Sequence, residues 1–181
     1  MNSNAPTLKI SKLDAAKRQL DCAIKLWFAN DDPVAIHTLA YSSHEIIHVL
    51  NLKIRGSSPA LLDSPHIRPE RRAEINLRIK SDGNFFKHAD RDPHAVIDFN
   101  PTTTEGLMIF TNLGLDSLGE RRSDLQSAFN FWNMIHHPDL FNTPTKVFLD
   151  SIGVVNMGTL KEIRKEDFLN FFFETRPRVR N

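Results

Sequence analysis

The chain has 181 residues, with 23 lysines and arginines against 22 aspartates and glutamates, and a formal net charge of +1. This balance excludes a strongly basic nucleic-acid coat protein, and a hydrophobic fraction of 40% excludes wholesale disorder. The single cysteine, Cys22, cannot form an internal disulfide, and residues 1–6 lack the apolar run of a signal segment. We therefore expect a cytoplasmic protein with no membrane-spanning segment. The unusual feature of its composition is the presence of eight histidines beside a single cysteine.

Helix-start signals mark the first quarter of the chain. Ser11 followed by Asp14 resembles a capping box and predicts a helix over residues 13–29. Asp32 followed by proline supplies an N-cap and a first helical residue that needs no N–H donor, which predicts a second helix over residues 33–52. The second helix is apolar around much of its circumference, so we expect it at the centre of the fold.

Two irregular stretches flank the next helix. Residues 55–68 are rich in glycine, serine and proline and are typical of a long loop. Pro69 then opens a helix that ends near residue 80 or continues past Gly83 to residue 89. Residues 90–101 form the second irregular stretch, in which residues 95–99 are compatible with one short strand.

The second half of the chain carries further helix signals. Three capping boxes are predicted, at Thr102 with Glu105, Ser123 with Gln126, and Thr159 with Glu162. Thr143 followed by Pro144 repeats the proline start. The predicted helices cover residues 103–117, 124–136, 144–151 and 160–174. Together these elements predict a single all-α domain over residues 1–181, a bundle of about six or seven helices with flexible ends at residues 1–10 and 175–181.

Four ring side chains share one face of the second predicted helix. His37, Tyr41, His44 and His48 fall within an arc of about 60°. His44 and His48, four residues apart, lie on successive turns, close enough to share a metal ion. The run from His44 to His48 includes Glu45 and matches the H-E-x-x-H signature of zinc metalloproteases. In those enzymes the histidines bind zinc and the glutamate activates the metal-bound water.

The context of this signature favours a helical bundle over a protease fold, because only a helix and a turn precede it. We therefore predict a divalent-metal site (Zn, Fe or Mn) with His44 and His48 as ligands and His37 or His88 completing it. Glu45 would be a ligand or general base, and an activated water would make the reaction hydrolytic. Other candidate third ligands are Asp90, His136 and His137. The alternative is that these histidines only pack at the edge of the apolar arc.

A second concentration of polar residues lies at positions 84–93, behind two adjacent phenylalanines. Asn84 and His88 share a face if the helix continues this far. Asp90 or Asp92 would then orient the imidazole and raise its basicity. The alternative is a solvated helix C-terminus in which basic side chains complement the helix dipole.

Residues 84–93, with the region of Trp132, resemble short bacterial all-helical proteins of unassigned activity. More distantly, this run is similar to the HEPN superfamily of small helical nucleases and nucleotide-binding modules, whose signature is an arginine followed, after four to six residues, by a histidine. The resemblance implies that His88 is a catalytic or RNA-contacting imidazole and Asn84 its polar neighbour. At positions 81–83, where the arginine should stand, the chain has serine, aspartate and glycine, so the phosphate-stabilising partner is missing.

The charged and aromatic residues give less specific indications of partners than the histidines do. Residues 68–92 carry seven basic against five acidic side chains, which is too even for a phosphate-binding surface, and the basic tail at 176–180 is typical of a frayed end. Aromatic residues crowd the helices predicted at 124–136 and 160–174, where core packing or a homodimer interface would use them. The alternatives to a metal-dependent hydrolase are a HEPN-like RNA-binding or ribonuclease module centred on His88 and a non-catalytic dimeric binding or scaffold protein.

Overall fold

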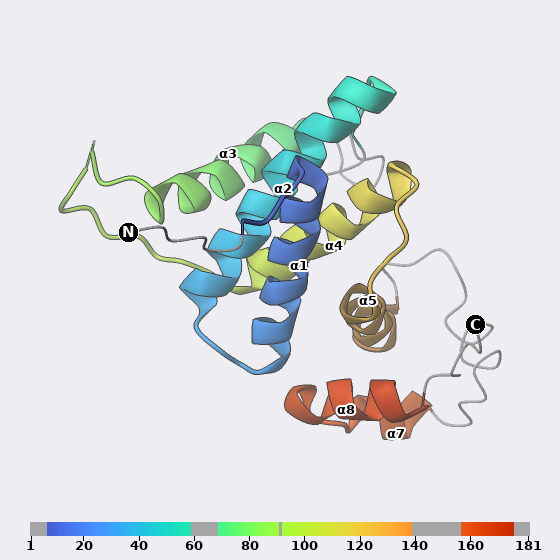
Figure 1. The fold of residues 1–181 in the computed structure, drawn as a ribbon. Helices are drawn as coiled ribbons and strands as arrows, with labels where there is room; N and C mark the ends of the chain where they lie inside the picture. The colour runs from blue at the N-terminus through green and yellow to red at the C-terminus, as the bar shows by residue number, and fades with distance from the viewer. Residues whose placement is uncertain (1–6, 59–68, 91, 139–156, 176–181) are drawn as a thin grey trace, which may run out of the picture.

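The computed structural model describes residues 7–58, 69–90, 92–138 and 157–175 (Figure 1). Within these ranges the chain is helical and contains no strand, which confirms the all-α class. The helices are α1 (Lys12–Phe28), α2 (Pro33–Arg55), α3 (Pro69–Phe85), α4 (Thr102–Ser117), α5 (Asp124–His136), α7 (Met157–Lys161) and α8 (Lys165–Thr175). The helix predicted at 144–151 and the basic tail lie outside the described residues.

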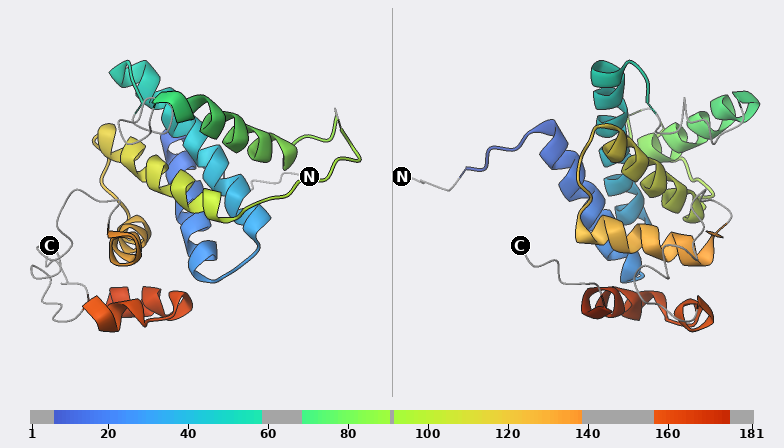
Figure 2. Two further views of the ribbon diagram at one scale, coloured as in Figure 1. Left: turned by 180° about the vertical axis from the view of Figure 1, so that it is seen from behind. Right: turned by 90° about the vertical axis from the view of Figure 1, so that its right-hand side faces the viewer.

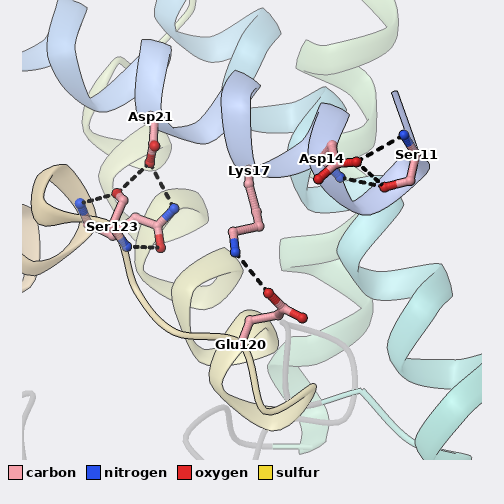
Figure 3. Close-up of polar contacts among 7 residues, drawn as sticks. Ser11, Asp14, Lys17, Asp21, Glu120 and Ser123 are labelled. Carbon is pink, nitrogen blue, oxygen red and sulfur yellow. Dashed lines mark hydrogen bonds and ion pairs between the residues drawn. The ribbon is translucent and has the colours of Figure 1, made fainter. Parts of the chain in front are cut away.

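Side-chain caps fix several helix starts, as predicted. Ser11 Oγ accepts from the Asp14 N–H at 3.0 Å, and the Asp14 carboxylate accepts from the Ser11 N–H at 3.1 Å. The same reciprocal pair joins Ser123 and Gln126 at 3.1 and 3.2 Å. Ser123 also donates to Asp21 of α1 at 2.7 Å, so this cap ties the start of α5 to α1 (Figure 3). Each box satisfies backbone donors that the first helical turn leaves without partners.

Two predictions about the middle of the chain were wrong. Residues 95–99 form no strand, because no second strand exists in the described ranges to pair with their backbone. The capping box at Thr102 and Glu105 does not form: α4 starts after Pro101 without a side-chain cap. Glu105 instead accepts a hydrogen bond from Trp27 Nε1 at 3.2 Å, which joins α4 to α1.

The single helix predicted over 160–174 is also wrong, because the chain breaks at residues 162–164 into α7 and α8. Leu160 and Phe168 are both buried. Eight residues apart on one continuous helix, they would face directions about 80° apart. The break lets both side chains reach the core, and it places Thr159 inside α7 rather than at a helix start.

Helix α2 is central, as its all-round apolar pattern predicted. It packs against α1 on one side and α4 on another, and α3 crosses over it (Figure 1). It runs to Arg55, three residues beyond the predicted end, and stops where Gly56 takes a positive φ of 76°. Helix α5 lies across α1, and α7 and α8 form a further layer against α5 (Figure 2).

An aromatic cluster joins α1, α5 and α8. Trp27 and Phe129 make an edge contact at 5.1 Å between ring centroids, and Trp132 and Phe168 make another at 5.0 Å. Phe28 stacks on Phe168 at 5.8 Å. Much of the aromatic surplus of α5 and α8 therefore packs inside the chain, where each of these rings buries a large apolar area, whereas Phe173 is exposed. The homodimer stays a prediction. None of the described helices is both long enough and apolar enough to span a bilayer.

Candidate functional site

A buried polar seam joins α2 to α4. His37 Nδ1 and Thr104 Oγ1 are hydrogen-bonded at 2.9 Å, and His44 Nδ1 and Thr111 Oγ1 at 3.3 Å. Both partners advance by seven residues in the same direction, so the two helices run parallel. Asn51, a further seven residues along α2, donates to a backbone carbonyl of α4 at 2.9 Å. Polar groups repeated every two turns of this kind fix the register of a helix pair.

The hydrogen bonds of Thr111 decide which nitrogen of His44 carries the proton. The Thr111 hydroxyl donates to the Leu107 carbonyl at 2.7 Å, so towards His44 it can only accept. His44 Nδ1 is therefore protonated, and Nε2 keeps a lone pair. Burial, with a smaller effect of the charge of His48, lowers the pKa of His44 to about 3. The ring is thus neutral at pH 7.

His44 also lines a cavity of about 190 Å³ between α2 and α3. The other lining residues are Tyr41, Glu45, His48 and Val49 from α2, and Asn76, Ile79 and Lys80 from α3. The rings of His44 and His48 lie nearly parallel, with centroids 6.1 Å apart. His48 Nδ1 is buried and has no hydrogen-bond partner among the described residues. A buried nitrogen without a partner costs about 1–3 kcal/mol, so a bound group that satisfied it would be stabilised.

Glu45 is held at the rim of the same cavity. The Tyr41 hydroxyl donates to Glu45 Oε1 at 3.0 Å, and Lys87 Nζ lies 4.0 Å from Oε2 and 4.3 Å from the centre of the Tyr41 ring. Burial and the bond to Glu45 raise the pKa of Tyr41, so the phenol keeps its proton. Gly83 permits this packing, because a Cβ there would lie 2.5 Å from the Tyr41 ring.

Asn76 faces the two histidines from α3, and sequence reasoning missed it. Its Nδ2 donates to the Arg72 carbonyl at 2.7 Å, which leaves Oδ1 as an acceptor beside the cavity that Asn76 lines. No local pattern marks this asparagine. Its position depends on how α3 crosses α2.

The predicted third ligands lie elsewhere. His37 is fully buried in an aromatic box, with its ring centroid 5.6 Å from that of Phe86 and 5.1 Å from that of Phe99. It does not line the cavity of His44 and His48. Burial, with a smaller effect of the Lys87 charge, lowers the pKa of His37 to about 4. His37 therefore acts as a neutral packing residue.

The histidines of α5 are equally remote from the cavity. His136 stacks on Trp132 with centroids 4.0 Å apart, and His137 is exposed at the end of the helix. Throughout the described ranges, no group of three or more histidine, cysteine, aspartate or glutamate side chains is placed to hold a metal ion. The structure therefore brings together His44, His48 and Glu45 around one cavity, and the other predicted ligands do not line it.

His88 lies in a different cavity, of about 480 Å³, between the end of α3 and the segment that follows it. The lining residues are Ser81, Asn84, Phe85, His88, Asp90, Asp92, Ala95 and Ile97. The sequence thus correctly grouped Asn84, His88 and the two aspartates. In the described part of this lining there are two carboxylates and no lysine or arginine, a charge opposite to that which a phosphate backbone requires.

Comparison with protein-family models, with curated proteins and with solved structures finds no match for this chain. The resemblance of residues 84–93 to the HEPN superfamily stays a prediction.

Proposed function

We propose that this protein binds a divalent transition-metal ion in the cavity between α2 and α3, with His44 and His48 as its nitrogen ligands. The observation that carries the proposal is the state of His44, whose Nδ1–H is engaged by Thr111 while Nε2 keeps a lone pair. An outer hydrogen bond to one ring nitrogen that leaves the other as a ligand is the usual arrangement of metal-binding histidines.

The donor set favours zinc over harder ions. Two imidazoles suit Zn²⁺ and Fe²⁺ better than Mg²⁺ or Ca²⁺, which prefer oxygen ligands. Asn76 Oδ1 and water are the oxygen donors available to complete the coordination. Burial already keeps His44 unprotonated at pH 7, so the ion would not have to displace a proton from that ring.

The direct test is metal content and zinc titration of protein purified without a histidine tag. We expect one Zn²⁺ per chain, bound in the micromolar range and lost in His48→Phe. His48 is half-buried, so this variant keeps the apolar body of the side chain and should fold. His88→Gln is the matched control, because it removes one histidine from a different cavity. Zinc binding that is unchanged in His48→Phe would contradict the proposal.

A hydrolytic role would use Glu45 as the base that accepts a proton from water. Its carboxylate is held by Tyr41 and lines the same cavity as the two histidines. We expect the zinc-loaded protein to hydrolyse an activated ester such as p-nitrophenyl acetate. Glu45→Gln should lower that rate by about 10²–10⁴-fold with zinc affinity unchanged. If Glu45→Gln keeps the full rate, metal binding stands without this chemistry.

A further inference from the structure

A third cavity separates α3 from α4 on the opposite side of Ile79. It has a volume of about 230 Å³, and its apolar lining is formed by Ile75 and Ile79 of α3 and by Leu107 and Phe110 of α4. Ile79 is the buried apolar residue that α3 contributes to the core, and it borders this cavity as well as the one with the histidines. Besides Ile79, Ile75 packs against the core and Gly83 approaches the Tyr41 ring, so α3 contacts the bundle at a few points with cavities on both sides of Ile79.

Two arginines border this apolar space. Arg71 and Arg78 are seven residues apart, two turns along α3, and both line the cavity and are exposed. Arg71 pairs with Glu74 at 3.2 Å. Arg78 makes no ion pair or hydrogen bond with any residue in the described ranges, and its charge acts only at longer range on Asp82. The cavity thus has an apolar lining and, at its border, the guanidinium of Arg78, which is not paired with any described residue.

Gly106 keeps the cavity open on the α4 side. A Cβ built on Gly106 meets no atom within 4 Å outside its own helix. An alanine methyl group would therefore fit without a clash, and we expect a longer side chain such as leucine to occupy part of the space that Gly106 lines. The glycine is not required for helix packing here, in contrast to Gly83 against Tyr41.

We infer that this cavity is a binding site for a single-chain anionic amphiphile, a medium-chain carboxylate, whose acyl chain lies between α3 and α4 and whose head group pairs with Arg78. The volume accommodates about eight groups of the size of a methylene or a water molecule. The apolar lining supplies burial for the chain, and the free guanidinium is complementary to a carboxylate. This inference does not depend on the metal site.

Titration with sodium octanoate, followed through the backbone amide signal of Gly106 by two-dimensional NMR, tests the assignment. We expect saturable binding of one octanoate per chain. Hexanoate should bind roughly tenfold more weakly, because it buries two fewer methylenes. Octyltrimethylammonium, with the same chain and the opposite charge, should bind more weakly than octanoate. Equal binding of the cationic and anionic probes would overturn the proposal.

A pair of variants at Gly106 separates filling of the cavity from any effect on folding. Both Gly106→Ala and Gly106→Leu should raise the melting temperature, because glycine is a poor helix residue. Gly106→Leu should weaken octanoate binding at least tenfold, whereas Gly106→Ala should leave it within about threefold. Octanoate affinity that is unchanged in Gly106→Leu would place the ligand elsewhere. A failure to bind octanoate would overturn the proposal. If the chain then dimerised in a concentration-dependent way that Gly106→Leu abolished, this face would be an interface with a second copy of the chain.

Discussion

Helix α2 uses histidine in two different ways on the side that faces α4 and on the side that faces α3. Towards α4, His37 and His44 are buried, each is paired with a threonine, and the helices run in a fixed parallel register. Towards α3, His44 and His48 border a cavity, and His48 Nδ1 is buried without a partner in the part of the chain that the structure describes. Among the described residues, His37 Nε2 and Asn51 Oδ1 on the α4 side are also buried without partners, so the difference lies in the cavity that the α3 side contains. We call the contact of α2 with α4 the closed side and its contact with α3 the open side.

The comparison shows that packing and ligand binding are not exclusive roles for a histidine. His44 belongs to both sides of α2: its Nδ1 is engaged by Thr111 of α4, and its ring also borders the α2–α3 cavity. The hydroxyl that fixes the helix register also fixes the tautomer that a metal ion would need. His37, one heptad earlier, is bonded to Thr104 in the same way but does not line this cavity, so only a structural role is assigned to it.

The largest expected effect is a loss of protein stability in mild acid, caused by the two histidines that are buried on the closed side. Burial lowers the pKa values of His37 and His44 to about 4 and about 3, so between pH 6.5 and those values the unfolded state binds more protons than the folded state. The free energy of unfolding should therefore fall as the pH decreases below 6.5. At about 1.4 kcal/mol per pH unit for each ring, the loss is roughly 4 kcal/mol for both by pH 5. Urea unfolding at pH 7.5, 6 and 5 measures it.

The variant His37→Phe measures how much of that pH dependence comes from His37. Its ring cannot be protonated and fits an aromatic box formed by Tyr41, Phe86 and Phe99. The fall in stability between pH 7.5 and pH 5 should be about half that of the unmodified chain. A free energy of unfolding that stays flat over this range in the unmodified chain would mean that the two rings are not buried as neutral groups.

The next largest effect is expected when one threonine hydroxyl is removed from the buried polar seam between α2 and α4. Thr104→Val or Thr111→Val keeps the shape of the side chain and leaves a buried imidazole nitrogen without its partner. We expect each change to lower the free energy of unfolding by about 1–3 kcal/mol. Thr38→Val is the control, since the Thr38 hydroxyl bonds only to a carbonyl of its own helix at 2.8 Å, and it should cost under about 0.5 kcal/mol. Equal losses in all three variants would show that the seam has no special role.

The closed side was partly visible in the sequence. The spacing of His37, His44 and Asn51 along α2 is seven residues, and Thr104 and Thr111 repeat it on α4. Either series alone is compatible with ordinary packing, and only the knowledge that the two helices are parallel neighbours joins them. The capping boxes at Ser11 and Ser123 were predictable because they are local, whereas the break between α7 and α8 depends on what the bundle buries on each side.

The open side was much less predictable for the same reason. The sequence grouped His44, Glu45 and His48, because one helix carries all three. It could not place Asn76 beside them, since that requires the crossing of α3 over α2. It also gave no reason for His37 to be enclosed away from the cavity, because residues on one helical face can be covered by different neighbours.

A smaller effect is expected where α3 approaches α2 most closely. In Gly83→Ala the new methyl group would lie 2.5 Å from a Tyr41 ring carbon, so α3 must shift. Overpacking of this kind costs about 1–3 kcal/mol, and the better helix propensity of alanine recovers up to about 1 kcal/mol. Hydrogen exchange should accelerate in α3 and stay slow along the seam of α2 and α4. Faster exchange in α4 as well would show that α3 is not a separate, weakly attached element.

The smallest expected effect concerns the ion pair at the rim of the open side. Lys87 Nζ and Glu45 Oε2 are 4.0 Å apart, and half of the Glu45 side chain is exposed. Because water screens such a pair, a double-mutant cycle of Lys87→Met and Glu45→Gln should give a coupling below about 0.5 kcal/mol that decreases further with added salt. Chemical unfolding of the four proteins at low and high salt measures it. A coupling as large as the loss in Thr104→Val, and independent of salt, would mean that the rim is as closed as the seam, and the contrast between the two sides of α2 would disappear.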